Sequence, residues 1–208
     1  MTADEFAAAL SVSRETMARL SAYAALLERW QRRINLVAGD SLADLWRRHF
    51  LDSAQLLALI PAPTAVALDI GSGAGFPGLV LAILGVRGIR LVEADARKCA
   101  FLREAARVAG LTLERDVFIV NRRLEKVPPF AADLVTGRAV APLVDLLRLT
   151  EPFRRPGTTC LFHKGGRVEE ELTEAAKTWR MAVERFPSRS DPSGTILRLT
   201  EVERDRCR

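Results

Sequence analysis

Three alternating glycines follow a short apolar segment, and this stretch gives the sequence its first chemical signal. Residues 66–70 are typical of a buried strand, and Pro77 is suited to the first turn of a helix. Glycines permit turns that other residues cannot make and let a ligand approach the main chain closely. A strand, a glycine loop and a helix N-terminus together predict a socket for a nucleoside-bearing cofactor.

The glycine loop fits two classes of cofactor. Counted from Gly73, it matches the glycine spacing of dinucleotide-binding loops, and Glu93 lies about twenty residues further on. In that pattern, however, the first glycine follows the strand directly, and here that residue is Gly71. The frame that begins at Asp69 resembles motif I of S-adenosylmethionine-dependent methyltransferases. An acidic residue there can bind an ammonium group or hold the loop through backbone N–H groups, whereas a pyrophosphate gains nothing from an anion. The methyltransferase interpretation is therefore favoured over a nicotinamide cofactor.

Strands and helices are expected to alternate after the loop. We expect strands at residues 66–70, 89–93, 117–120, 133–136, 158–162 and 195–199, and helices at 77–84, 97–109, 142–149 and 168–179. This alternation predicts an α/β fold with a doubly wound, Rossmann-like parallel sheet covered by helices on both faces.

Ligands of such sheets gather at the carboxyl ends of the strands, so residues at those ends are candidates for the site. Glu93 ends the second expected strand and could accept hydrogen bonds from both ribose hydroxyls, or could cap a helix instead. Leu124 and Glu125 follow the third strand, where backbone groups could contact an adenine edge. Arg138 ends the fourth strand and Lys164 follows the fifth, although a solvated surface charge is the alternative for each.

A helical extension is expected to precede the sheet. Apolar residues recur on one face of residues 14–34, and Ser41 with Asp44 has the spacing of a capping box for a second helix that ends near Ile60. Two prolines in residues 61–63 then form a break. The sequence predicts a helical extension over residues 1–60, packed on a cofactor-binding domain over 61–208, with a frayed end at 203–208.

The bulk composition limits the class of protein. The chain has 208 residues, 49% of them hydrophobic, and a net charge of +5 in which only four of the 31 basic residues are lysines. This arginine content suits contacts to RNA phosphates, although a genomic bias would produce it too. The three cysteines are few and scattered, no cluster has metal-ligand spacing, and no apolar run could span a membrane. A cytoplasmic protein without a metal is expected.

The residues after the expected strands restrict the methyl acceptor. Methylation of an exocyclic amine is usually served by an Asn/Asp-Pro-Pro-aromatic motif, but Gly137 and Arg138 stand in its place. Methylation of cytosine C5 needs a cysteine nucleophile, and Cys160 is more simply explained as core. A ring nitrogen such as guanine N7 already has a free lone pair and needs no general base, which this site permits.

Motifs along nearly the whole chain resemble the glucose-inhibited division protein B family, bacterial methyltransferases that modify N7 of a guanine in 16S rRNA. The glycine loop is shared with many methyltransferases, so the more specific matches lie elsewhere in the chain. They are Ile34-Asn35-Leu36, Arg48-His49-Phe50-Leu51-Asp52-Ser53, Arg97-Lys98, Phe101-Leu102, Arg123-Leu124-Glu125, Arg138-Ala139 and Lys164-Gly165. Leu124 differs from the smaller residue expected there, and Gly137 stands where Ser or Ala is commoner.

The resemblance implies a function for each matching position. S-adenosylmethionine would be the cofactor, with Gly71 and Phe76 lining it, beside the loop residues Asp69 and Gly73 and the strand-end residue Glu93. Leu124 and Glu125 would frame the adenine, and Arg138 would lie at the junction of cofactor and substrate as the catalytic residue.

The substrate would be 16S rRNA, either free or within the small ribosomal subunit, methylated by a monomeric enzyme. Arg33, Arg48, His49 and Lys164 would contact the RNA. His49 falls on an apolar helix stripe, so a buried structural histidine is equally open, and Asp52 at i+3 could orient its imidazole. A cofactor-free RNA-binding module on a methyltransferase fold is the non-enzymatic alternative.

Overall fold

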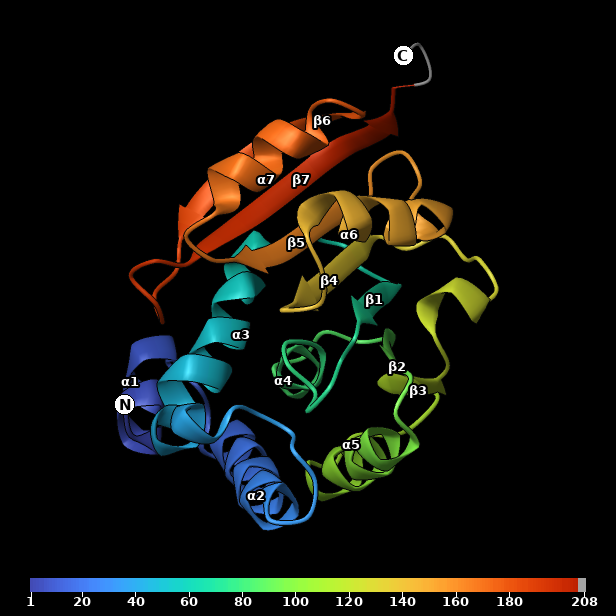
Figure 1. Ribbon diagram of the computed structural model, residues 1–208. Coiled ribbons are helices and arrows are strands. Elements are labelled where there is room, and N and C mark those ends of the chain that lie inside the picture. The colour runs from blue at the N-terminus through green and yellow to red at the C-terminus, as the bar shows by residue number, and fades with distance from the viewer. Residues whose placement is uncertain (206–208) are drawn as a thin grey trace.

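Seven strands form one sheet within residues 1–205, the part of the chain that the computed structural model describes, in the order β3-β2-β1-β4-β5-β7-β6 (Figure 1). Strands β1 to β5 run parallel, and β7 pairs antiparallel with both β5 and β6. The strands are β1 Ala67–Ile70, β2 Ile89–Glu93, β3 Val117–Asn121, β4 Leu134–Arg138, β5 Thr159–Lys164, β6 Trp179–Pro187 and β7 Thr195–Arg204.

The sheet separates two apolar cores because successive side chains of a strand point to opposite faces. In β1, Ala67 belongs to one core, while Leu68 and Ile70 belong to the other. In β4, Leu134 and Val135 divide in the same way. Strands buried on both faces are typical of parallel sheets covered by helices, which confirms the predicted fold class.

Helices cover the two faces unequally. The first core contains buried residues of α1 (Ala3–Leu10), α2 (Arg14–Gln31), α4 (Gly78–Ile83) and α5 (Ala96–Val108), and the second those of α6 (Leu143–Thr150) and α7 (Val168–Ala175). Tyr23 of α2 packs the N-terminal helices against the elements that cover the sheet. Its ring centroid lies 5.5 Å from that of Phe76, just before α4, and 6.2 Å from that of Phe101 in α5. The N-terminal helices therefore share a core with the sheet. The division at residue 60 stays a prediction.

The segment between α2 and β1 is an irregular helix. It passes through a 3₁₀ turn, η1 (Gly39–Asp44), a π-helical turn, η2 (Trp46–Leu51), a short α turn, α3 (Asp52–Ala54), and a second 3₁₀ turn, η3 (Gln55–Leu59). The predicted capping box was wrong. The Ser41 hydroxyl donates to Ala38 O at 2.6 Å instead, and the Asp44 carboxylate binds Arg47 and the N-terminal amine. A π-helical turn is rare and is often found at a functional site.

The chain also departs from prediction at its two ends. Helix α1 was missed, although Thr2 and Glu5 form a capping box at its start. Helix α7 ends at Ala175, and Trp179, predicted as helical, begins the edge strand β6. Charged outward side chains on β6 obscured its alternation. The predicted frayed end was wrong for residues 203 and 204, which belong to β7, while residues 206–208, including Cys207, lie outside the described part.

No helix within residues 1–205 is both long and apolar enough to cross a membrane.

Candidate functional site

In the glycine loop between β1 and α4, two positions leave the main chain uncovered by a side chain. Gly71 and Gly73 have φ values of +58° and +55°, in the left-handed region that favours glycine. A Cβ atom at Gly71 would lie 2.9 Å from a methyl group of Val140. Position 71 therefore favours glycine for two reasons, its backbone conformation and the lack of space for a side chain. The main chain of Gly71 faces the cleft described below.

Asp69 lies beneath the loop and is fully buried. The hydroxyl of Thr136 donates to its Oδ1 at 2.7 Å, and a Cβ at Gly78 would be 2.8 Å from its Oδ2. Burial raises the pKa of Asp69 to about 6, and polar groups of Ser72, Thr136 and Gly78 limit the rise. The carboxylate is thus bonded through Oδ1 to Thr136 of β4, while its buried Oδ2 has no hydrogen-bond partner among the described residues and lies against the start of α4.

Glu93 joins the loop to the end of β2. Its Oε2 accepts a hydrogen bond from Gly73 N at 2.9 Å, and its Oε1 accepts one from Asp95 N at 2.8 Å. Each carboxylate oxygen keeps a second acceptor site, because an ionised carboxylate has about four lone-pair positions. The residue therefore holds the loop and could still accept from a ligand hydroxyl.

A cleft of about 710 Å³ opens beside the loop, at the carboxyl ends of the strands. It brings together seven of the predicted site residues, namely Gly71, Gly73, Phe76, Arg48, His49, Arg138 and Lys164. The other five predicted site residues, all within residues 1–205, do not line it. Asp69 lies beneath the loop and Glu93 ends β2, Arg33 is exposed just beyond α2, and Leu124 and Glu125 lie in the turn η4 (Leu124–Lys126) after β3.

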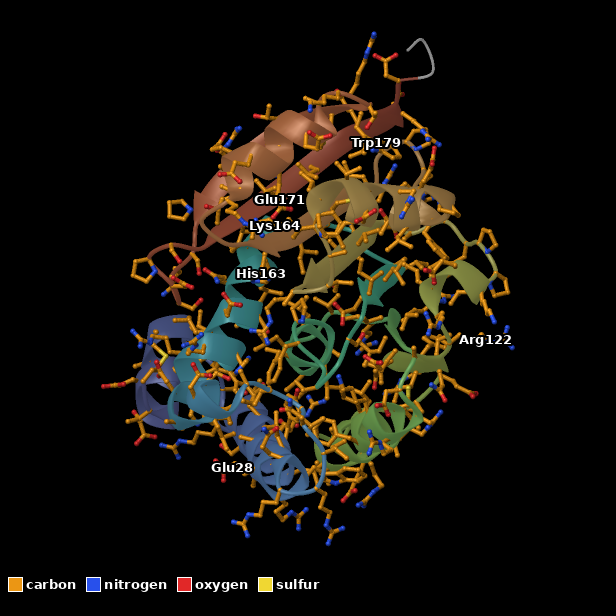
Figure 2. All side chains as sticks on the ribbon, in the orientation of Figure 1. Glu28, Arg122, His163, Lys164, Glu171 and Trp179 are labelled. Atoms are coloured by element: carbon orange, nitrogen blue, oxygen red, sulfur yellow. The ribbon has the colours of Figure 1, made fainter. Side chains whose placement is uncertain are left out.

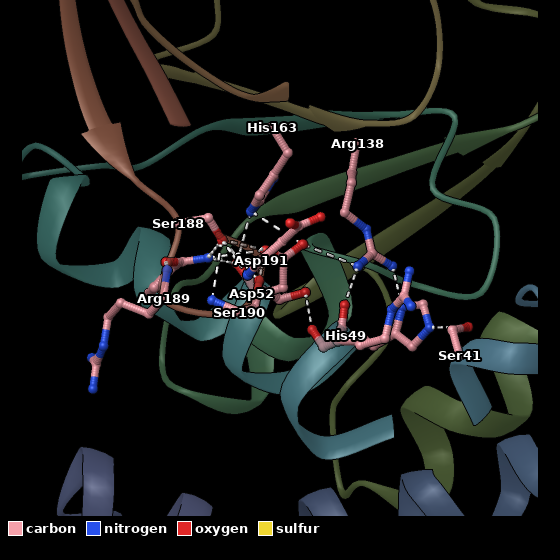
Figure 3. Close-up of polar contacts among 12 residues, drawn as sticks. Ser41, His49, Asp52, Arg138, His163, Ser188, Arg189, Ser190 and Asp191 are labelled. Carbon is pink, nitrogen blue, oxygen red and sulfur yellow. Dashed lines mark hydrogen bonds and ion pairs between the residues drawn. The ribbon is translucent and has the colours of Figure 1, made fainter. Parts of the chain in front are cut away.

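Arg138, the last residue of β4, is held by several partners at the wall of the cleft (Figure 3). Its NH1 donates to the carboxylate of Asp52 at 3.1 Å and to Arg48 O at 2.9 Å, and its NH2 donates to Nδ1 of His49 at 2.6 Å. The guanidinium carbon also lies 5.1 Å from the centre of the Phe76 ring. The strand-end arginine is thus fixed in orientation.

His49 is a neutral acceptor in this arrangement. Burial and the charge of Arg138 lower the pKa of His49 to about 3. With Nδ1 accepting from Arg138, Nε2 carries the proton and donates to Ser41 Oγ at 2.7 Å. The imidazole also stacks on Phe76, with 4.9 Å between ring centroids. Ser41 and Arg138 therefore orient the imidazole, where sequence reasoning had offered Asp52.

Cys160 and Lys164 of β5, for which the sequence allowed a chemical role, are both engaged in the structure of the protein. Cys160 is fully buried in β5, and burial raises the pKa of its thiol to about 12, so a thiolate nucleophile is not available. Lys164, at the end of the same strand, lies beside Glu171 (Figure 2) and donates to it at 2.7 Å, and it also donates to Ala141 O at 2.9 Å. Lys164 thus fixes the segment that follows Arg138.

Three participants in the site were missed by sequence reasoning. Ser41 orients His49, His163 donates to Asp52 O at 2.7 Å, and Ser190 donates to Asp52 Oδ1 at 2.5 Å. His163 lies beside Lys164 in β5, a spacing that could have drawn attention to it. Packing explains why glycine stands at position 137, since a Cβ there would be 2.9 Å from Ile70 Cγ1.

The cleft fits a nucleoside-bearing cofactor. Its volume lies within the range of small-molecule sites, roughly 300–1,000 Å³. Two glycines with left-handed φ present main chain to the cleft, and an aromatic ring and a neutral imidazole form its wall. Within residues 1–205, no group of three or more His, Cys, Asp or Glu side chains could hold a metal ion.

The chain matches the family model described as rRNA small subunit methyltransferase G over residues 16–193. It is 59% identical over 204 residues to the "Ribosomal RNA small subunit methyltransferase G" of Rhodospirillum rubrum, covering 98% of this chain and 100% of the relative. It is 51% identical to the protein of the same name from Paramagnetospirillum magneticum, covering 100% of this chain and 99% of that one.

Solved structures share the fold at much lower identity. A putative O-methyltransferase from Klebsiella pneumoniae superimposes with a TM-score of 0.60 at 17% identity, over 95% of this chain and 94% of that one. The M. jannaschii TYW2 structure, which is a complex with AdoMet, gives a TM-score of 0.57 at 15% identity, over 84% and 80% of the two chains. These likenesses show that the fold is shared.

Proposed function

The chain belongs to the rRNA small subunit methyltransferase G family, and from that membership we infer that it transfers the methyl group of S-adenosylmethionine to N7 of a guanine in 16S rRNA. The observation that carries this function is the single cleft that contains both the glycine loop and Arg138. One wall suits a nucleoside cofactor, and the other presents a fixed guanidinium to the group that receives the methyl.

The cofactor would be held chiefly by main chain. Gly71 and Gly73 present open backbone, Phe76 offers a ring to the cleft, and Glu93 has free acceptor positions for ribose hydroxyls. Leu124 and Glu125 would frame the adenine from the turn after β3, and Asp69 would hold the loop from below. When bound, S-adenosylmethionine supplies an electrophilic methyl group on a sulfonium.

Arg138 would position the guanine and is not a base. A guanidinium donates hydrogen bonds and stays protonated. Guanine N7 carries its own lone pair, so methylation there needs no proton removed first, and the neutral His49 is already engaged through both ring nitrogens. The chemistry left to the protein is alignment of donor and acceptor, in which a misplacement of about 1 Å can cost on the order of a hundredfold in rate.

The RNA would approach over the rim of the cleft. Arg48 is exposed there, and we propose that it and Arg33 contact phosphates, with His49 and Lys164 at the base of the same surface. Binding carried by phosphate contacts weakens as salt rises. We further propose that the enzyme acts as a monomer in the cytoplasm, where the small ribosomal subunit is assembled.

Transfer to rRNA can be tested directly. The purified protein is incubated with methyl-labelled S-adenosylmethionine and either naked 16S rRNA or small subunits from a strain that lacks the enzyme. Mass spectrometry of nuclease digests should locate one methyl group on guanine N7. A methyl found only on an exocyclic amine or on cytosine C5 would contradict the proposal.

Calorimetry separates the remaining alternatives. S-adenosylmethionine should bind and NADH should not; comparable affinity for NADH would favour an oxidoreductase. RNA binding without cofactor binding would instead favour the non-enzymatic module.

A further inference from the structure

Asp52 lies at the centre of the polar cluster behind Arg138 and takes contacts from four separate parts of the chain. Its Oδ2 binds NH1 of Arg138 at 3.1 Å, and its Oδ1 accepts from Gln55 Nε2 at 2.9 Å and from Ser190 Oγ at 2.5 Å. Nε2 of His163 donates to the backbone oxygen of Asp52 and lies 3.6 Å from its Oδ2. The carboxylate cannot rotate without breaking several of these bonds.

The charge of Asp52 is maintained despite its burial. Only 12% of its side chain is exposed, which by itself would favour the neutral acid. Attraction to the protonated form of His163, the charge of Arg138 and the hydrogen bond from Ser190 outweigh that effect and keep the pKa of Asp52 below its usual value, although burial also lowers the pKa of His163 itself. The other ionisable groups near the pair are His49, which is neutral, and the exposed Arg48 and Asp191. Asp52 is therefore the anion that faces Arg138.

The ion pair is well placed to fix a guanidinium. The side chains of Arg138 and Asp52 are 17% and 12% exposed, so water and salt screen the pair less than they screen a surface pair. The remaining partners of the guanidinium, His49 Nδ1 and Arg48 O, are uncharged acceptors. Hydrogen bonds between ionised groups are roughly twice as strong as neutral ones. Without the Asp52 charge, Arg138 would keep only its weaker contacts.

The β6–β7 loop, residues 188–194, reaches this cluster from the edge of the sheet that β6 and β7 form. Besides the bond from Ser190, Ser188 Oγ lies 3.4 Å from Asp52 Oδ1, and Arg189 N donates to Gln55 Oε1 at 2.8 Å. Ser188 and Ser190 also bind each other at 2.8 Å. The loop thus holds the side of the carboxylate that faces away from Arg138 (Figure 3).

We propose that Asp52, held by Ser190 of the β6–β7 loop, is a positioning residue that sets the Arg138 guanidinium for methyl transfer. This inference rests on the proposed function, in which Arg138 aligns the guanine. Asp52 acts through Arg138 and touches neither reacting atom. The consequence is that its removal should matter only while Arg138 is present.

A double-mutant cycle tests that consequence. Single-turnover rates are measured with small subunits for the wild type, Asp52→Asn, Arg138→Ala and the double variant. Asp52→Asn should lower the rate by roughly ten- to a hundredfold, the range that misalignment produces. In the Arg138→Ala background, the same change should alter the rate by no more than about twofold, as expected for residues that act as a unit. An equal loss in both backgrounds would overturn the proposal.

Ser190 supplies a milder version of the same test. Ser190→Ala should lower the rate by about threefold to tenfold, in line with the net contribution of one typical hydrogen bond, because Gln55 and Arg138 still bind the carboxylate. Ser190→Thr keeps the hydroxyl and should restore most of the rate. Ser193→Ala is the matched control in the same loop, because the Ser193 hydroxyl binds Asp191 and not Asp52. Equal losses in Ser190→Ala and Ser193→Ala would contradict the role of Ser190.

A variant of a second carboxylate serves as the control for a general loss of stability. Asp133 pairs with Arg155 and accepts from Ala65 N and Val66 N, away from the cleft. Asp133→Asn should lower the melting temperature and leave the rate per folded molecule unchanged.

One readout does not depend on methyl transfer. In nitrogen-15 NMR of the free enzyme, the terminal guanidinium nitrogens of Arg138 should give separate signals in the wild type, because the ion pair hinders rotation. They should average in Asp52→Asn. Unchanged Arg138 signals in that variant would overturn the inference even if rRNA proves not to be the substrate. An inactive wild type with averaging in Asp52→Asn would contradict only the proposed function.

Discussion

The two walls of the cleft are built in different ways. The wall of the glycine loop comes from one continuous stretch, in which Asp69 and Gly78 pack against each other nine positions apart. The opposite wall joins residues that are far apart in the chain: Arg138 and Asp52 are separated by 86 positions, and Ser190 and Asp52 by 138. The first wall uses backbone shape, and the second uses side-chain charge. Damage to the first should therefore affect binding, and damage to the second should affect rate.

The largest expected effect is on the glycine wall. Gly73→Val should raise the dissociation constant for S-adenosylmethionine by at least about a hundredfold, because a β-branched residue is strained at φ +55° and covers the open main chain. The fold should survive, since the nearest atom to an added Cβ is Gly71 O at 3.7 Å. Calorimetry and a melting curve measure the two quantities.

Gly166→Ala is the matched control for this change. A Cβ there meets nothing within 4 Å, so cofactor affinity should not change. Wild-type affinity in Gly73→Val would show that the cofactor does not approach this backbone.

On the opposite wall, Arg138→Lys should lower kcat by about a hundredfold while cofactor affinity changes little. Lysine keeps a positive charge for Asp52 but lacks the planar set of donors that reaches Asp52 and His49 together. The melting temperature should stay near that of the wild type, because the carboxylate is still paired. If Arg138→Lys methylates rRNA at the wild-type rate, the positioning role is wrong.

The two walls should also differ in how they link stability to pH. The pKa of Asp69 is about 6 in the fold against 3.8 ordinarily, so the folded state holds a proton that the unfolded state has lost. The contribution of Asp69 to the free energy of unfolding therefore falls as the pH rises from 4 to 6. The pKa of His49 is about 3 against 6.5, so the unfolded state binds the proton and the free energy of unfolding rises over the same range. Each full proton contributes about 1.4 kcal/mol per pH unit.

Variants separate these opposite contributions. Asp69→Asn should make the free energy of unfolding rise more steeply from pH 4 to 6 than in the wild type, and His49→Gln should make it rise less steeply. Urea unfolding at four pH values measures both slopes. Parallel curves for the wild type and Asp69→Asn would mean that Asp69 ionises normally in the fold.

The smallest effect on activity is expected at Cys160, which is buried in the second core. Cys160→Ser should leave turnover per folded molecule unchanged, because the buried thiol takes no part in transfer. It should lower the free energy of unfolding by roughly 1–3 kcal/mol, since a hydroxyl would be buried in an apolar core. Loss of turnover in a fully folded variant would revive the cysteine nucleophile.

The sequence predicted the first wall better than the second for the same physical reason. Strand, loop and helix of the glycine wall follow one another, so the types and spacing of Asp69, Gly71 and Gly73 were sufficient to place them. Arg138 was placed because strand ends of a parallel sheet meet at one edge. Its partners Ser41 and Ser190 come from irregular segments, and no periodicity predicts where such segments pass.

Errors in secondary structure followed the same division. The buried strands β1 and β2 were predicted within one residue, because their apolar runs are bounded by glycines and acids. The edge strand β6 was not predicted, and its first residue, Trp179, was assigned to the preceding helix, since outward Arg and Glu side chains break the apolar pattern of the strand. The π-helical turn at residues 46–51 changes which residues are neighbours, so the i+3 relation of His49 and Asp52 did not yield the predicted contact.

Tyr23 has a consequence for how this enzyme could be recombined with others. Its buried hydroxyl donates to Ala74 O within the glycine loop, and a Cβ at Gly75 would lie 2.9 Å from that hydroxyl. A helix near the start of the chain thus packs directly on the glycine loop. Residues 61–205 are therefore not an exchangeable cassette: a chimera that replaces the first sixty residues must supply a phenol at this point or rebuild the loop.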